Sequence, residues 1–229
     1  MKKKHERREA IIDLLLNRAA LKQDIADYSE GVFESFKVVV QDELKELKKS
    51  VDDSRIRLSF EDKGKYEFQV FIGSDTLVFQ LHPNIFRFDD QNPLWETDYL
   101  KENGANGFFG VIQIFNFLAE SMEQSRMNDV GYLIGRMFMN HNYHFMLEGK
   151  GPIGTSFVDL ENSVLTDEVQ RQIVQTAMAF AINFDLVVPP YKMVQQISVG
   201  QIQQISSDLQ MATGKRLGFK FSAEDETIF

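Results

Sequence analysis

Apolar residues recur every three or four positions through the first 50 residues, the spacing that places side chains on one face of a helix. The first stretch of this pattern consists of Ile11, Ile12, Leu14, Leu15, Ala19, Leu21 and Ile25. The second runs from Val32 to Leu47. Because glycine costs about 1 kcal/mol in a helix interior, we expect Gly31 to separate two helices between residues 4 and 50.

The period changes to two from Arg55 onward, which is the alternation of half-buried strands. Three or four strands are predicted between residues 55 and 88, with turns at 61–64 and 73–75. Glycine and aspartate in those turns favour hairpins independently of the alternation. The pattern therefore predicts an antiparallel meander.

The remaining residues mix irregular, helical and extended patterns. Predicted elements are an irregular acidic loop over 89–107, a buried helix over 109–124, a hairpin over 132–147 with its turn at Asn140–His141–Asn142, a short strand over 156–160, helices starting at Thr166 and spanning 199–212, and a final strand over 217–221. Within the hairpin, Tyr132, Ile134, Arg136 and Phe138 are expected on one face.

These elements predict an α+β fold: an antiparallel meander sheet packed with helices and preceded by an N-terminal helical arm. The expected organisation is an arm over 1–50, a single α+β domain over 51–222 and a flexible acidic tail over 223–229. In element order alone, residues 32–185 resemble type III secretion chaperones and related regulators. That order is a helix, three strands, a helix, two strands and a helix.

Two strand pairs carry apolar residues on both faces. Phe71 and Val78 lie opposite the main apolar stripe of the first sheet, and Met137 and Met139 do so in the second hairpin. A sheet that is apolar on both faces must be covered twice, by helices of the same chain or by a second subunit. These four residues are therefore candidate interface residues, and a homodimer is predicted.

The cysteine content and the charge exclude several kinds of functional site and binding partner. The 229 residues contain no Cys, which excludes disulfide scaffolds, thiolate metal sites and cysteine nucleophiles. The net charge is -9, yet residues 1–10 carry five Lys/Arg against two Glu. Nucleic acid is an unfavourable partner for such an acidic protein, except at this basic N-terminus. No apolar run is long enough for a membrane span or a secretory leader, so a cytoplasmic location is expected.

A glycine string follows the second hairpin. Gly149, Gly151 and Gly154 match the spacing of a dinucleotide-binding fingerprint, in which a strand delivers glycines to a helix that holds the pyrophosphate. Pro152 lies inside the string, and an extended segment is expected after it. A tight connection is the favoured interpretation, so no cofactor is predicted.

A few polar residues could support hydrolysis. Asp129, Glu148 and Lys150 resemble the two acids and the lysine of metal-dependent nucleases of the PD-(D/E)xK pattern. His144 alternates with Glu148 on the same strand and could pair with it or join it at a metal. His141 lies three residues from His144, a spacing that places the two on opposite strand faces. Turn chemistry and chance account for these residues more simply than a metal site.

The sequence thus favours a non-enzymatic protein-binding or regulatory module that acts through protein–protein contacts, as a homodimer. Two alternatives stay open. One is a metal-dependent phosphodiesterase or nuclease that uses Asp129, Glu148 and Lys150. The other is a sensor of a nucleotide or metabolite, with its pocket between the sheet and the helix expected over 109–124.

Overall fold

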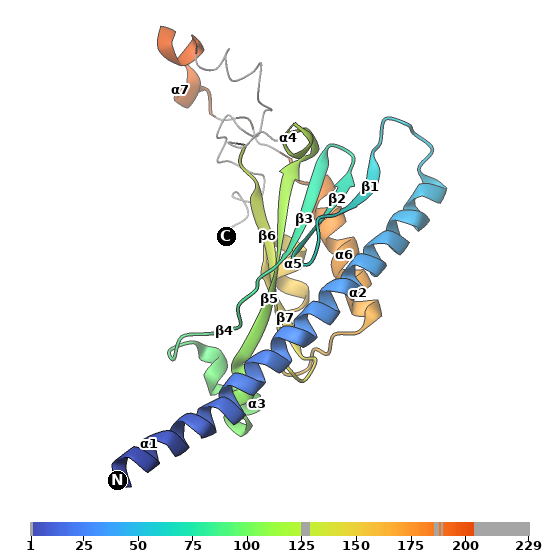
Figure 1. The fold of residues 1–229 in the computed structure, drawn as a ribbon. Coiled ribbons are helices and arrows are strands. Elements are labelled where there is room, and N and C mark those ends of the chain that lie inside the picture. Colours follow the sequence, from blue (N-terminus) through green and yellow to red (C-terminus); the bar gives the residue numbers. More distant parts are fainter. Residues whose placement is uncertain (1, 125–128, 186–187, 189, 204–229) are drawn as a thin grey trace.

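The computed structural model describes residues 2–124, 129–185, 188 and 190–203. The chain forms a seven-stranded antiparallel sheet with a long N-terminal helix and further helices (Figure 1), which confirms the α+β class. The helical elements are α1 (Lys2–Asp13), the π-helical η1 (Leu14–Ala19), α2 (Ala20–Ser50), the 3₁₀ turn η2 (Pro93–Glu96), α3 (Asp98–Glu102), the 3₁₀ turn η3 (Gly104–Gly107), α4 (Ala119–Glu123), α5 (Gly151–Ser156), α6 (Asp167–Ile182) and α7 (Tyr191–Val194). The strands are β1 (Leu58–Asp62), β2 (Glu67–Ile72), β3 (Asp75–Leu81), β4 (Phe86–Arg87), β5 (Phe108–Leu118), β6 (Tyr132–Met139) and β7 (Phe145–Gly149).

The N-terminal helix is continuous from Lys2 to Ser50, through α1, η1 and α2. The predicted break at Gly31 is wrong. Gly31 is exposed within α2, and its neighbours Val32 and Phe33 are buried. Packing of those side chains outweighs the cost of about 1 kcal/mol that glycine imposes on a helix.

The strand order β1-β2-β3-β5-β6-β7 contains a strand that the sequence pattern did not predict. Residues 108–118 form β5, between β3 and β6, and only 119–123 are helical. The expected buried helix over 109–124 is therefore wrong, and with it the element order that resembled type III secretion chaperones. A central strand covered on both faces is apolar on both, so its sequence resembles that of a buried helix.

A β-bulge in β6 changes which residues share a face. Ile114 lies opposite Gly135 and Phe115 opposite Leu133, which leaves Ile134 as an extra residue. Ile134 therefore packs in the same cluster as Met137 and Met139. The expectation that Ile134 shares a face with Arg136 and Phe138 is wrong for this reason.

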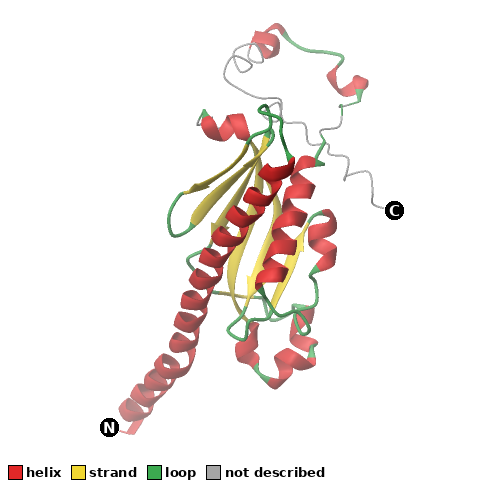
Figure 2. Cartoon of the chain, turned by 90° about the vertical axis from the view of Figure 1, so that its right-hand side faces the viewer, coloured by secondary structure: helices red, strands yellow, loops and turns green. Residues whose placement is uncertain are grey.

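One face of the sheet is covered by two helices, α2 and α6 (Figure 2). We call it the helix face. Its cluster combines apolar residues of both helices with those of five strands, including Phe33, Phe36, Phe68, Phe79, Ile112, Phe145 and Ala177. Thr166 caps α6, as predicted, by accepting a hydrogen bond from the Val169 amide at 3.3 Å.

The outer edge of β7 is bonded to the loop that leads to α6. The amides of Phe145 and Leu147 donate to the carbonyls of Ser163 and Phe157, at 3.1 and 2.6 Å. The strand predicted over 156–160 is not formed as such, because Ser156 ends α5 and the chain then runs irregularly along β7.

The C-terminal predictions are only partly covered by the described residues. Residues 199–203 are helical, and Ser198 Oγ accepts from the Gln201 amide at 3.1 Å. The rest of the helix predicted over 199–212, the strand over 217–221 and the tail over 223–229 lie outside the described residues.

Candidate functional site

We call the opposite face of the sheet the second face. Short helical turns and single side chains cover it, in place of long helices. Residues 89–107, predicted to be an irregular acidic loop, fold into three short helical turns. Their apolar side chains pack on β5 and β6 in a separate cluster that contains Phe88, Leu94, Trp95, Tyr99, Leu100, Phe109, Val111 and Phe138. This segment covers one end of the second face.

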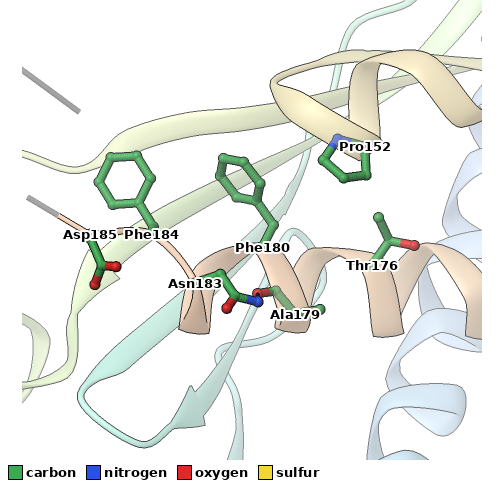
Figure 3. A pocket seen from close by; sticks show the side chains of 7 residues that line it. All are labelled: Pro152, Thr176, Ala179, Phe180, Asn183, Phe184 and Asp185. Atoms are coloured by element: carbon green, nitrogen blue, oxygen red, sulfur yellow. Dashed lines mark hydrogen bonds between the residues drawn. The ribbon is translucent and has the colours of Figure 1, made fainter. Parts of the chain in front are cut away.

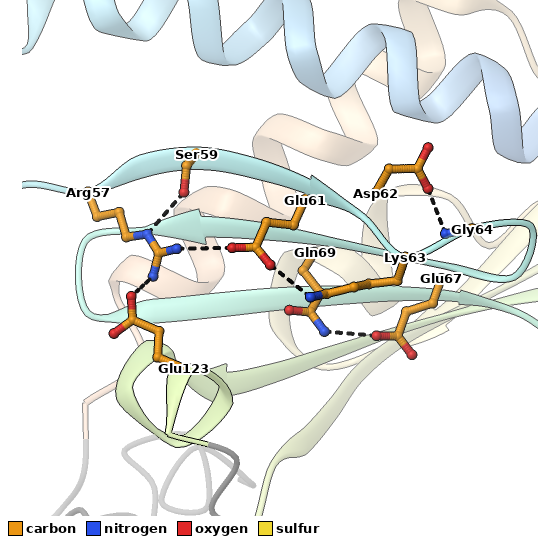
Figure 4. Close-up of polar contacts among 9 residues, drawn as sticks. All are labelled: Arg57, Ser59, Glu61, Asp62, Lys63, Gly64, Glu67, Gln69 and Glu123. Carbon is orange, nitrogen blue, oxygen red and sulfur yellow. Dashed lines mark hydrogen bonds and ion pairs between the residues drawn. The ribbon is translucent and has the colours of Figure 1, made fainter.

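An arginine covers part of the other end. The Arg57 guanidinium lies 3.4 Å from the centroid of the Phe71 ring. Ser59 at 3.0 Å, Glu61 at 3.3 Å and Glu123 hold it there (Figure 4). Arginine stacks well on aromatic rings because its planar guanidinium is weakly hydrated. Phe71 is thereby buried with a polar surface above it.

The four candidate interface residues are buried within this chain. Phe71 and Val78 are 1% and 6% exposed on the second face. Met137 and Met139 are 1% and 0% exposed in the helix-face cluster, on the side opposite to the expected one. With so little exposed area they have little to offer to a second subunit.

A hollow of about 380 Å³ remains on the second face, and we call it the groove. Its floor is a block of cross-strand neighbours, Val111 with Phe138 and Gln113 with Arg136. The segment that leaves β3 and pairs again with β5 forms its wall. Together the lining residues are His82, Phe86, Arg87, Phe88, Phe109, Val111, Gln113, Arg136 and Phe138.

Two arginines give the groove its charge. Arg136 donates to Glu148 across the β6–β7 ladder, at 3.1 Å from Nε and 2.5 Å from Nη2. Arg87 pairs with Asp90 and lies 4.6 Å from the Trp95 ring. Both arginines have N–H groups beyond those engaged in these hydrogen bonds.

Two further hollows are present. One of about 690 Å³ shares Phe88 and Arg136 with the groove and extends over Met146 and Glu148 of β7. Another of about 420 Å³ lies between Pro152 of α5 and the last turns of α6, with Phe180 and Asp185 in its lining (Figure 3). The latter presents one carboxylate and few other polar groups.

The glycine string has a packing role. Gly149 ends β7, and Gly151, with φ 52°, begins α5. A Cβ on Gly154 would overlap the Gly149 carbonyl. Gly151 begins α5, a helix of only six residues that packs against β7. The glycine string therefore forms the tight connection that the sequence favoured.

The residues considered for hydrolysis lie in separate surroundings. Glu148 of the outer strand β7 pairs with Arg136 of β6. Asp129 accepts from Ser121 Oγ at 2.6 Å, next to α4. Lys150 is exposed at the start of α5. Over the described residues, no three His, Asp or Glu side chains gather where they could hold a metal ion.

Both histidines of the second hairpin belong to a polar network that anchors its turn. Asn140 is buried, and its Nδ2 donates to Tyr99 Oη at 2.9 Å and to the Asn106 carbonyl at 3.1 Å. His144 stacks on the Tyr99 ring, and its Nδ1 lies 3.0 Å from the Leu160 carbonyl. Burial lowers the pKa of His141, against the opposing effect of Asp24. His144 thus has partners other than the predicted Glu148.

The N-terminal helix projects beyond the sheet (Figure 1). Five apolar residues of this projection are 47–70% exposed, namely Ile11, Ile12, Leu14, Leu15 and Leu16. Ile11, Leu14 and Leu15 recur at a spacing of three to four residues, N-terminal to Ile25 and Val32, which pack against the sheet. An exposed apolar stripe therefore lies on the helix beyond the end of the sheet.

Comparisons of the chain with models of known families, with curated proteins and with solved structures found no match. Within the part of the chain that the structure describes, none of the helices combines the length and apolarity needed to cross a bilayer.

Proposed function

We propose that this protein is a non-enzymatic protein-binding module that acts through protein–protein contacts as a homodimer. The observation that carries the proposal is the exposed apolar stripe on the projecting helix, around Leu14 and Leu15. Exposed apolar residues that are contiguous on one element are typical of interaction surfaces, whereas scattered ones are not.

The stability of the projection is a second argument. Residues 5–20 have exposed side chains throughout. Isolated helices of that length are marginal in water, and most helical stability in proteins comes from packing of an apolar face. A partner helix on Leu14 and Leu15 supplies that packing.

Charge favours a second copy in antiparallel orientation as the occupant. Arg7 and Arg8 precede the stripe, and Asp24 and Asp27 follow it on an exposed part of α2. Arg7 and Asp24 are equally far along the chain from the point between Leu15 and Leu16, so an antiparallel pair centred there sets them at the same height on the two helices. A parallel pair would instead place the basic segments side by side, which is unfavourable.

The test is the oligomeric state. Sedimentation equilibrium of the full chain is expected to give a dimer. Leu15→Glu is expected to weaken it by at least about tenfold, because burial of a leucine contributes about 1.5–3 kcal/mol. Val38→Glu is the matched control, since Val38 is an exposed apolar residue of the same helix, beside the sheet. A wild-type monomer at high micromolar concentration contradicts the proposal.

The orientation has its own test. Arg7→Asp or Asp24→Arg alone is expected to weaken the dimer, and the two changes together are expected to restore it. Restoration requires that the two side chains meet across the interface. If the double variant is as weak as the sum of the single ones, the antiparallel orientation is wrong.

A further inference from the structure

We propose that the groove on the second face binds a small organic anion with an apolar body, namely an alkyl or aryl carboxylate. This inference goes beyond the proposed function, because the groove lies on the sheet and the dimer surface on the projecting helix.

The apolar part of such a ligand matches the groove's interior. Four phenylalanines and Val111 account for most of its lining. Phe88 closes one end, with its ring 5.3 Å from Phe109 and 5.0 Å from Phe138. A hollow of about 380 Å³ lies within the size range of small-ligand sites.

The sign of the charge comes from the polar lining. Arg87, Arg136, Gln113 and His82 are its polar members, and no Asp or Glu lines the groove. The protein as a whole has a net charge of -9. The charged side chains that line the groove are positive, so the groove is opposite in sign to the rest of the protein. A cation would find no carboxylate among these residues, whereas a carboxylate would find two guanidinium groups, each paired with one carboxylate outside the lining.

The donors also suit a carboxylate in shape. A guanidinium presents a planar fork that a carboxylate can accept from with both oxygens. Glu148 takes two donors of Arg136, and Asp90 takes one of Arg87, so each fork keeps further N–H groups. His82 Nδ1 accepts from the Asn84 amide at 3.1 Å, which places the proton of a neutral His82 ring on Nε2 as one more donor.

Trp95 offers a built-in reporter. It is the only tryptophan of the chain, and Arg87 of the groove lies over its ring. A ligand that draws Arg87 toward itself changes the contact between the guanidinium and the indole. Binding is therefore expected to alter the Trp95 fluorescence.

The experiment titrates the full-length protein with octanoate, octanamide and octylamine, by calorimetry and by Trp95 fluorescence. Octanoate is expected to bind, octanamide to bind about tenfold more weakly and octylamine not to bind. Equal affinity for all three, or no octanoate binding up to millimolar concentration, overturns the proposal.

Variants locate the site. Arg87→Gln and Arg136→Gln are each expected to weaken octanoate binding by roughly tenfold. Arg55→Gln is the matched control, because Arg55 is an exposed arginine paired with Asp53 and does not line the groove. Val111→Phe, which fills the groove and keeps both arginines, is expected to abolish binding in a protein whose circular dichroism is unchanged. Octanoate binding that survives all three groove variants contradicts the assignment.

The two proposals fail independently. Leu15→Glu, which is expected to disrupt the dimer, is expected to bind octanoate as the wild type does. A monomeric protein that still binds octanoate in an Arg87-dependent manner removes the dimer and keeps the groove.

Discussion

The two faces of the sheet are covered by different means. Two long helices, α2 and α6, close the helix face with continuous apolar stripes. Short turns and single side chains, such as Trp95 and Arg57, cover the second face and leave the groove between them. A long helix brings apolar side chains at regular intervals, whereas a turn brings one or two. Hollows therefore form on the face that the turns cover.

Removal of a phenylalanine from each face tests this difference most strongly. Phe79→Ala on the helix face is expected to lower the free energy of unfolding by about 3–5 kcal/mol, since Phe79 is 1% exposed and stacks on Phe68 at 4.6 Å. Phe138→Ala is expected to cost roughly 2 kcal/mol less, because Phe138 borders the groove and is therefore packed on fewer sides. Urea unfolding of both variants measures the contrast, and equal losses would contradict it.

Added volume under the short turns is the next largest effect. A Cβ on Gly107 would overlap the Trp95 indole, so Gly107→Ala is expected to cost about 1–3 kcal/mol and to shift the Trp95 emission. Gly104→Ala is the matched control in the same turn, because nothing lies within 4 Å of its Cβ position. An unchanged emission in Gly107→Ala would mean that Trp95 does not pack as described.

Loss of the arginine cover is expected to be smaller. Arg57→Ala uncovers Phe71 and is expected to cost about 1 kcal/mol by urea unfolding. Arg55→Ala, at an exposed pair with Asp53, is expected to change stability by less than about 0.5 kcal/mol. If both variants lose equal stability, the contact with Phe71 contributes nothing beyond an ordinary surface pair.

The smallest effect concerns pH at the turn between β1 and β2. The Gly64 amide and then Lys37 lower the pKa of Asp62 below its ordinary value of 3.8. The stability that Asp62 contributes is therefore present above pH 3.8 and is lost as the pH falls through its lower folded value. Asp62→Asn is expected to be slightly less stable than the wild type at pH 7, by a margin that narrows as the pH falls below 3.8. A margin that stays constant on acidification would show that the charge of Asp62 is not its cause.

Strands whose sequence alternates between apolar and polar residues were predictable, and β5, which shows no such alternation, was not. In β1, apolar Leu58 and Phe60 alternate with Ser59 and Glu61, so the period of two is visible. β5 has no such polar face, and its pattern equally fitted a helix. Its phenylalanines, isoleucines and Val111 are residues that favour strands, and they were the signal that would have corrected the assignment.

The groove could not be found by spacing. Its residues come from the end of β3, from β4 and its flank, from β5 and from β6. The bulge at Ile134 shifts the alternation of β6 by one residue. Arg136 and Phe138 therefore face the groove, and Met137 faces the helices. The available signal was compositional: Phe86-Arg87-Phe88 places a cation between aromatic residues in an acidic chain.

The two outer strands of the sheet, β7 and β1, are protected in different ways from pairing with a strand of another chain. The loop over 157–165 already takes amide groups on the free side of β7, so another chain cannot extend the sheet there without displacing it. β1 is the other edge, and Glu61, Asp62 and Lys63 lie at its end. Charged side chains at an edge strand disfavour pairing with a second sheet. Aggregation through cross-strand addition is thus opposed at one edge by occupied hydrogen bonds and at the other by charge.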